Sequence, residues 1–299
     1  MKQVEGKVAF ITGGASGIGF GMAQVFLKAG MKVIIADILQ ERLDEAARML
    51  AQSTNRDYHF IKLDVTDRKA MAAAAAEAEQ VFGKVHVLCN NAGVFGNLPI
   101  ETASYEDWDW VLGVNLGGVV NGVVSFLPKM IAHGEGGHIV NTSSMAGLIP
   151  LPSAGGLYAT SKFAVRGLTD SLRLALGAHN IGVSVLCPGM TRTRILQAEV
   201  HRPGHEAKEP TDAEAHGSFT GDMAGGMDPV ELGERVLLGI QRNDAYILPH
   251  GEFKDEVQGL FDDIISGFPE GQEIDPGRKA FEDGRRQATA EAKAAIKNN

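Results

Sequence analysis

Short apolar, β-branched runs alternate with longer segments of helical period from the start of the sequence to about residue 249. The apolar runs cover residues 7–12, 32–37, 58–65, 85–90, 138–143, 182–187 and 245–249. The helical segments between them cover residues 18–29, 40–52, 68–82, 105–133, 158–178 and 229–241. Regular alternation of this kind predicts an α/β fold, in which a parallel sheet, here of seven strands, is covered by helices on both faces. No boundary interrupts the pattern, so we expect one doubly wound domain over residues 1–250.

The composition favours a soluble globular protein and argues against polyanionic partners. The chain has 37 acidic and 28 basic residues and a net charge of −9, so we expect no nucleic-acid partner. Residues 1–7 are polar and no run approaches the roughly 18 apolar residues that span a bilayer, so neither a secretory signal nor a membrane segment is expected. Cys89 and Cys187 end apolar runs and are predicted to be buried free thiols. These features predict a cytoplasmic protein.

Two segments depart from the alternation. Residues 191–228 are rich in Gly, Pro, His and Glu, and a long irregular segment inside a compact domain is often a lid over a binding site. We expect a substrate lid here; the alternative is a permanently packed insertion. Residues 251–299 continue past the last predicted strand and carry apolar residues at helical spacing. This part is predicted to be a C-terminal helical extension of the same domain.

A glycine-rich segment joins the first predicted strand to the first predicted helix. It reads Thr-Gly-Gly-Ala-Ser-Gly-Ile-Gly over residues 12–19. Glycines allow a tight turn and a close approach of the backbone to a pyrophosphate, and the helix N-terminus adds free N–H groups and a positive dipole end. Because a strand precedes the segment and a helix follows it, the segment predicts a dinucleotide site in a Rossmann-type domain.

Asp37 ends the second predicted strand and bears on the choice of dinucleotide. A carboxylate there accepts hydrogen bonds from the adenosine ribose hydroxyls and repels a 2′-phosphate. Its neighbours Ser16 and Ile38 are not basic, so nothing in the local sequence is placed to hold that phosphate. We therefore expect NAD as the cofactor rather than NADP. Asp37 can also serve as a helix N-cap.

The spacing of the loop, Thr-Gly-x-x-x-Gly-x-Gly, resembles the short-chain dehydrogenase/reductase family. Further motifs follow in the family's order: Asp64-Val65, Asn90-Asn91-Ala92-Gly93, Asn115, Ser143-Ser144, Tyr158-Ala159-Thr160-Ser161-Lys162 and Pro188-Gly189. Together they are highly specific, although each alone is not. The interval from Ser144 to Tyr158 is one residue longer than is usual in the family. The strands around residues 138–140 and 246–249 and the C-terminal tail are also similar to bacterial Cα-dehydrogenases, which oxidise benzylic alcohols of lignin-derived aryl ethers.

The resemblance implies an oxidoreductase that transfers a hydride between NAD(H) and a secondary alcohol or ketone, with Tyr158 as general acid/base. Lys162 follows four residues later on the same helix face, so its ammonium is expected to lower the pKa of Tyr158; it also holds the nicotinamide ribose. Ser144, rather than Ser143, is expected to donate a hydrogen bond to the substrate oxygen. Asn115 is implied to anchor a water through its main-chain carbonyl in a local helix distortion. The predicted catalytic residues are thus Asn115, Ser144, Tyr158 and Lys162.

The residues predicted to bind the cofactor come from the glycine-rich loop and the ends of the strands. They are Gly13, Ser16, Gly17, Ile18, Gly19, Asp37, Asp64, Val65, Asn91, Ala92, Gly93, Tyr158, Lys162, Pro188, Gly189, Thr191 and Thr193. The alternative for the two threonines is a helix cap. No metal is expected: His201, His205 and Glu209 have helical ligand spacing, but Pro203 interrupts such a helix.

Loops that follow strands carry apolar residues, and open α/β sheets bind ligands at this edge. These residues are Phe95, Met145, Leu148, Leu151, Met190, Ile195 and Phe219. They predict an apolar, aromatic small-molecule substrate; hydroxysteroids and polyols are alternatives, and a non-catalytic NAD-binding sensor is an alternative function. The resemblance also implies a homodimer or homotetramer paired through residues 105–133 and 158–178.

Overall fold

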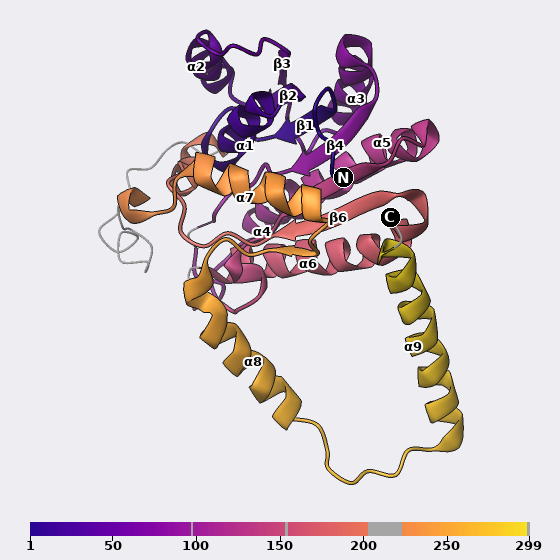
Figure 1. Cartoon of the computed structure of the whole chain (residues 1–299). Coiled ribbons are helices and arrows are strands. Elements are labelled where there is room, and N and C mark those ends of the chain that lie inside the picture. Colours follow the sequence, from indigo (N-terminus) through magenta and orange to yellow (C-terminus); the bar gives the residue numbers. More distant parts are fainter. Residues whose placement is uncertain (97, 153–154, 203–222, 298–299) are drawn as a thin grey trace.

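The computed structural model describes residues 1–96, 98–152, 155–202 and 223–297. It contains a parallel sheet of seven strands in the order β3-β2-β1-β4-β5-β6-β7 (Figure 1). The strands are β1 (Val8–Thr12), β2 (Lys32–Asp37), β3 (Tyr58–Lys62), β4 (Val85–Asn90), β5 (Gly137–Thr142), β6 (Ile181–Leu186) and β7 (Tyr246–Ile247). The order reverses between β1 and β4, which is where such sheets open a ligand crevice at their carboxyl edge.

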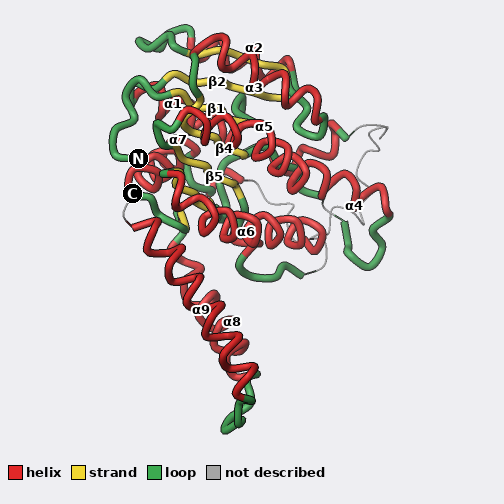
Figure 2. Tube along the Cα trace, turned by 90° about the vertical axis from the view of Figure 1, so that its right-hand side faces the viewer, coloured by secondary structure: helices red, strands yellow, loops and turns green. Residues whose placement is uncertain are grey.

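Helices cover both faces of the sheet (Figure 2). They are α1 (Gly17–Lys28), α2 (Gln40–Leu50), α3 (Arg68–Phe82), α4 (Tyr105–Leu112), α5 (Gly118–His133), α6 (Gly156–Leu176) and α7 (Pro229–Arg242). Alternate side chains of β1 divide between the faces: Ala9 and Ile11 pack with α1, α2 and α7, whereas Val8 and Phe10 pack with α3 and α5. Burial on both faces explains why the strands are continuous apolar runs in the sequence.

The predicted seven-stranded, doubly wound sheet is therefore confirmed, and most boundaries agree within two residues. The last strand is shorter than expected, since β7 pairs with β6 only at Tyr246 and Ile247. Residues 105–133 form one continuous helix that is π-helical over Gly113–Gly117, between α4 and α5. Cys89 and Cys187 are buried free thiols, as predicted.

Within the described ranges, one helix is long and apolar enough to cross a membrane on length and composition alone. It is the continuous helix Tyr105–His133. Phe126 and Met130 of this helix lie in the core beneath the sheet, where Phe126 contacts Phe10 with 4.5 Å between ring centroids. A core helix of a soluble protein passes the same test, so this feature is weak evidence for a membrane segment.

The C-terminal extension is helical, as predicted, and projects from the body of the protein (Figures 1 and 2). It consists of α8 (Lys254–Ser266) and α9 (Pro276–Lys297). Val257 packs against Cys187 and its neighbours at the base of α8, and Ile296 returns to contact Gly177 beyond the end of α6. Between these anchors the apolar side chains of the extension are exposed, among them Phe261, Ile264, Ile265, Phe268 and Phe281.

Much of the predicted lid, residues 203–222, lies outside the described residues, as do His205, Glu209 and Phe219. Its two described ends are fixed to each other: Thr191 and Met227 form a parallel bridge, and the backbone N–H of Arg192 donates to the carbonyl of Met227. The lid stays a prediction.

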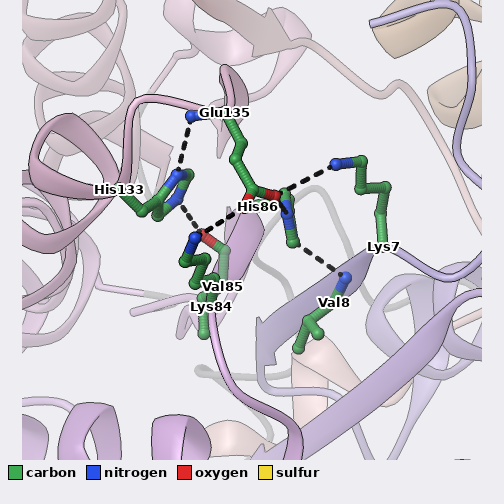
Figure 3. Close-up of polar contacts among 7 residues, drawn as sticks. All are labelled: Lys7, Val8, Lys84, Val85, His86, His133 and Glu135. Carbon is green, nitrogen blue, oxygen red and sulfur yellow. Dashed lines mark hydrogen bonds and ion pairs between the residues drawn. The ribbon is translucent and has the colours of Figure 1, made fainter.

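A polar network holds the amino ends of β1 and β4 together (Figure 3). The Glu135 carboxylate, in the turn after α5, contacts the ammonium groups of Lys7 and Lys84 at 3.5 and 2.6 Å and the His86 ring at 3.0 Å. The His86 ring also accepts a hydrogen bond from the backbone N–H of Val8. Lys84 and His86 hold the pKa of Glu135 well below its usual value. The network lies at the edge of the sheet opposite the cleft described below, so its role is to position strands.

Candidate active site

A cleft of about 520 Å³ opens at the carboxyl ends of the strands, where the strand order reverses. Fourteen of the residues predicted to bind a cofactor line it: Gly13, Ser16, Gly17, Ile18, Asp37, Asp64, Val65, Asn91, Ala92, Gly93, Tyr158, Lys162, Pro188 and Thr193. The other three, Gly19, Gly189 and Thr191, do not line it. Chain segments that are far apart in the sequence therefore meet at one site.

The glycine-rich loop has the conformation that its sequence predicts. Gly13 and Gly17 have φ angles of 61° and 50°, which favour glycine. A Cβ atom on Gly19 would come within 2.0 Å of the Gly13 carbonyl oxygen. Only glycine at position 19 therefore allows the first turn of α1 to pack against the loop. The Asn91 amide fixes the loop by donating to the carbonyls of Thr12 and Gly13, at 3.1 and 3.3 Å.

The N-terminus of α1 keeps its backbone donors free of a side-chain cap. Ser16 is the N-cap residue, but its hydroxyl makes no capping hydrogen bond. The N–H groups of the first helical turn therefore have no side-chain partner at Ser16, and Gly17 and Ile18 of this turn line the cleft. Together with the positive end of the helix dipole, this arrangement suits a phosphate group. These donors and the Asp37 carboxylate, which lies beside the loop and lines the same cleft, are groups that could hold a dinucleotide.

The Asp37 side chain is buried and fixed by backbone donors. Its Oδ2 atom accepts from the N–H of Ala15 at 3.3 Å, and its Oδ1 atom accepts from the N–H of Leu39 at 3.2 Å. Burial raises the pKa of this carboxyl, while the two hydrogen bonds and the nearby guanidinium of Arg42 oppose that shift. The N-cap of α2 is Leu39, so Asp37 is not the helix cap that sequence reasoning left open.

Tyr158 and Lys162 lie one turn apart on the same face of α6, at the wall of the cleft. The Lys162 Nζ atom lies 5.4 Å from the centre of the Tyr158 ring and donates to the carbonyl of Thr142 at 3.0 Å. A Cβ atom on Gly93 would come within 3.3 Å of Nζ, so glycine at this position leaves room for the ammonium.

The pKa of Tyr158 is raised, whereas the sequence predicted that Lys162 would lower it. Burial raises the pKa of the Tyr158 phenol to about 12, although a hydrogen bond with Ser144 acts in the opposite direction. Burial also lowers the pKa of the Lys162 ammonium to about 8. The expected lowering of the phenol pKa is therefore not seen, because taking both groups out of water disfavours their charged forms.

The two candidate serines have different partners. The Ser143 hydroxyl is buried and donates to the main-chain carbonyl of Lys162 at 2.7 Å. The Ser144 hydroxyl accepts from the backbone N–H of Ala146 at 3.1 Å and interacts with the Tyr158 phenol. Ser143, which lines the cleft, thus fixes α6 to the end of β5. Ser144 does not line the cleft; its hydroxyl lies beside Tyr158 and donates to the carbonyl of Pro188 at 3.4 Å.

Asn115 lies inside the π-helical turn Gly113–Gly117, which matches the predicted helix distortion. Its side chain is fully buried and pairs with the backbone of Val94, accepting from the N–H at 2.8 Å and donating to the carbonyl at 3.0 Å. It also donates to the Ser161 hydroxyl at 2.9 Å. The amide thereby joins the loop after β4 to α6, beside the catalytic candidates.

The Pro188-Gly189 segment is held by a histidine that sequence reasoning missed. The N–H of Gly189 donates to Nδ1 of His250 at 3.0 Å, and a Cβ atom on Gly189 would lie 2.9 Å from that ring. Of the two threonines that follow, Thr193 packs against Gly17 of the glycine-rich loop, and Thr191 is buried.

Part of the predicted apolar wall surrounds Tyr158. Phe95 contacts the Tyr158 ring with 4.9 Å between centroids, and Leu151 and Ile195 pack against the same cluster. Other members lie elsewhere: Met145 and Leu148 pack beneath α8, and Met190 is exposed. A loop residue after a strand can point to either side, so the sequence alone did not separate these two groups.

Three arginines in the cleft were also missed. Arg42 donates to the Ser16 hydroxyl at 2.9 Å; Arg194 pairs with Glu45; and Arg202 pairs with Asp107. The Arg202 guanidinium also lies 5.1 Å from the Trp110 ring centre. Each pairing joins segments whose relative position depends on the fold, so no local sequence pattern indicates it.

A glycine-rich nucleotide loop with a tyrosine and a lysine one helical turn apart is the expected arrangement of the family that the motifs resemble. The sequence profile described as short chain dehydrogenase matches residues 7–203. The chain belongs to the short-chain dehydrogenase family. This short-chain dehydrogenase is accordingly an oxidoreductase with a Rossmann-type fold.

Individual relatives agree with this assignment. The chain is 40% identical over 272 residues to the C alpha-dehydrogenase of Sphingobium sp. strain NBRC 103272 / SYK-6, covering 89% of this chain and 87% of that protein. Among solved structures, apo LigO from Sphingobium sp. strain SYK-6 has 40% identity and a TM-score of 0.77, covering 96% of this chain and 97% of that one. A short-chain dehydrogenase/reductase from Burkholderia phymatum in complex with NAD has 34% identity and a TM-score of 0.83, covering 92% and 100%.

Proposed function

We propose that this short-chain dehydrogenase uses NAD to interconvert an apolar aryl secondary alcohol and the corresponding ketone. The observation that carries the proposal is that the Tyr158 phenol, the Lys162 ammonium and the Asp37 carboxylate all line one cleft. This combination supports one site for both, with a carboxylate suited to a ribose and an acid/base pair suited to a carbinol.

Residues of this chain would hold the dinucleotide at three points. Asp37 would accept hydrogen bonds from the adenosine ribose hydroxyls, and the N-terminus of α1 would bind the pyrophosphate. Lys162 would bind the nicotinamide ribose. Bound NAD(H) supplies or accepts the hydride. The relative solved in complex with NAD supports this choice of cofactor.

Tyr158 would handle the proton of the reacting hydroxyl. It would accept that proton when the alcohol is oxidised and return it when the ketone is reduced. Ser144 would donate a hydrogen bond to the same oxygen and stabilise its developing negative charge. Because burial holds the pKa of Tyr158 at about 12, the positive charges of Lys162 and of the oxidised nicotinamide are needed to favour the phenolate. Asn115 would anchor a water beside Lys162 and so open a path for the proton.

The wall around Tyr158 supports an aromatic substrate. Ile195 lines the cleft, and Phe95 and Leu151 pack with Tyr158 in the same apolar cluster, so the reacting centre has an apolar wall, which would also exclude water from hydride transfer. The relative named C alpha-dehydrogenase covers most of this chain and supports a benzylic carbinol within that class.

A substrate screen tests the proposal. Formation of NADH would be followed with aryl, steroid and polyol secondary alcohols at matched concentrations. We expect kcat/KM to be at least about tenfold higher for aryl alcohols, because each apolar group placed against an apolar wall contributes about 1–3 kcal/mol. A preference for polyols or steroids would overturn the substrate class. NAD binding without turnover of any alcohol would favour the sensor.

We also infer a cytoplasmic location and assembly into a homodimer or homotetramer. Two buried free thiols support a reducing compartment. Exposed apolar residues on α5 and α6, which include Val124 and Phe163, support pairing through these helices.

A further inference from the structure

The two helices of the C-terminal extension leave the body at separate points and stand apart from each other along their length (Figure 1). No residue of α8 is buried, and its apolar residues recur every three or four positions, as on one face of a helix. These residues, with the first one beyond the helix, are Val257, Leu260, Phe261, Ile264, Ile265 and Phe268. A helix of 13 residues is marginal in water on its own, so the exposed apolar stripe favours a partner that covers it.

The two helices carry opposite charges. α8 has four acidic residues and one basic residue, a net charge of −3, whereas α9 has six basic and three acidic residues, a net charge of +3. Ion pairs such as Lys279–Asp283 run along α9 itself and leave its excess of positive charge unchanged. Two copies of α8 would therefore repel each other, as would two copies of α9, but α8 of one molecule attracts α9 of another. The extension of a second copy is thus the partner whose charge fits.

The extension is attached to the body at opposite ends of α6 (Figure 1). At the base of α8, Val257 packs with Met145 and its neighbours, in the turn that precedes α6. At the end of α9, Ile296 contacts Gly177, the residue that follows α6. The extension therefore spans the length of α6 and projects away from the body beyond this helix (Figure 2). Reversing the direction of α6 would exchange the positions of the two attachment points.

We propose that the extension binds the extension of a second copy of this chain, with α8 of each copy packed against α9 of the other. A twofold axis parallel to the extension, placed between paired faces of α5 and α6, sets α6 antiparallel to the same helix of the partner. The attachment point of α8 then faces that of the partner's α9, and both extensions project in the same direction. The four helices form one bundle, which buries the apolar stripes and places each negative helix beside a positive one. This contact extends the pairing inferred through α5 and α6 and does not depend on the reaction.

Charge reversal in the full chain tests the contact, with sedimentation velocity over a dilution series as the readout. Asp262→Lys with Asp263→Lys changes the net charge of α8 from −3 to +1, and Arg285→Glu with Arg286→Glu changes that of α9 from +3 to −1. Each variant alone brings like charges together, so its dissociation constant should rise by about tenfold or more. An equimolar mixture of the two variants restores opposite charges at both contacts. The mixture should recover the affinity of the unmodified protein to within about threefold.

Two further variants complete the test. Glu231→Lys with Glu234→Lys makes the same change of charge at exposed positions of α7 and is the matched control, which should leave the association unchanged. Ile264→Asp places a charge in the apolar stripe at a residue that is 53% exposed in the single chain, so it should weaken association without unfolding the body.

Circular dichroism would compare the helix content of each variant with that of the unmodified protein. Unchanged association of both charge variants, or a loss of association that their mixture does not reverse, would overturn the contact between extensions. Unchanged association of Ile264→Asp would overturn it as well, and this variant decides the question if a charge reversal lowers the helix content. An unmodified protein that stays monomeric would exclude the contact altogether.

Discussion

The ammonium of Lys162 lies 5.4 Å from the centre of the Tyr158 ring, and both side chains are almost completely buried. Burial disfavours the charged form of each group, so the pair is held in an environment that raises the pKa of the phenol and lowers that of the ammonium. Groups with strongly perturbed pKa values in a cleft are typical of catalytic sites.

Tyr158→Phe keeps the ring that packs against Phe95 but removes the ionisable hydroxyl. We expect kcat to fall by roughly 10²-fold or more, because general acid–base catalysis contributes about that much, while NADH affinity stays near normal. Steady-state kinetics and cofactor titration provide the two measurements. Full activity in this variant would remove Tyr158 from the mechanism.

Replacing Ser144 should mainly affect catalysis, whereas replacing Ser143 should mainly affect stability. Ser144→Ala removes the hydroxyl beside Tyr158 and should reduce kcat by about 10- to 10³-fold, as for loss of one oxyanion donor. Ser143→Ala removes a buried hydrogen bond to the Lys162 carbonyl and should mainly lower the free energy of unfolding, by about 1–3 kcal/mol. Kinetics and urea unfolding of both variants make the comparison, and a larger catalytic loss in Ser143→Ala would reverse the assignment.

Lys162→Met should abolish activity and raise the free energy of unfolding at pH 7. Because the pKa of Lys162 is lowered from 10.5 to about 8, the folded protein bears the cost of a buried ammonium at pH 7, by up to about 3 kcal/mol. Between these two pKa values the unfolded chain holds more protons, so the native protein gains stability relative to the variant as pH rises.

Urea unfolding at several pH values measures this difference. The variant should be inactive and the more stable protein at pH 7, with an advantage that shrinks above pH 8. Lower stability of the variant at pH 7, by an amount independent of pH, would show that the ammonium is not destabilised by burial.

Assembly is tested on the exposed face of α5. Val120, Val124 and Ile131 lie on one side of this helix and are exposed, with 67% of Val124 accessible. Val124→Lys should dissociate the predicted homo-oligomer, because a charge cannot be buried there without a partner. Leu238→Lys on α7 changes a similarly exposed apolar residue and is the control. Light scattering would report the masses, and an unmodified protein that is monomeric at micromolar concentration would refute the pairing.

Features encoded by short-range patterns could be predicted from the sequence. The predicted bounds of β2 agree with the structure because its apolar run ends at Asp37. The tight turn predicted from Gly13 and Gly17 is also present, and both glycines have the positive φ angles that such a turn requires. The π-helical turn at Asn115 was expected from the family resemblance, since no residue propensity predicts such a turn.

Features that depend on how distant segments meet could not be predicted. Arg42 reaches Ser16 only because α2 lies beside the start of α1, and His250 reaches Gly189 from beyond β7. The direction of the pKa shift at Tyr158 depends on the depth of burial, which the Tyr-x-x-x-Lys spacing does not encode. Likewise, the sequence placed Met145 at the substrate wall, but the loop directs it beneath α8.

Isotope transfer tests the central claim most directly. The unmodified protein would be incubated with NAD and 1-phenylethanol that carries deuterium on the carbinol carbon, and the NADH formed would be analysed by mass spectrometry. We predict that each NADH gains one deuterium, that the rate falls relative to the unlabelled alcohol, and that Tyr158→Phe forms little NADH. Unlabelled NADH, or no NADH from any aryl secondary alcohol, would contradict hydride transfer from a benzylic carbon at this site.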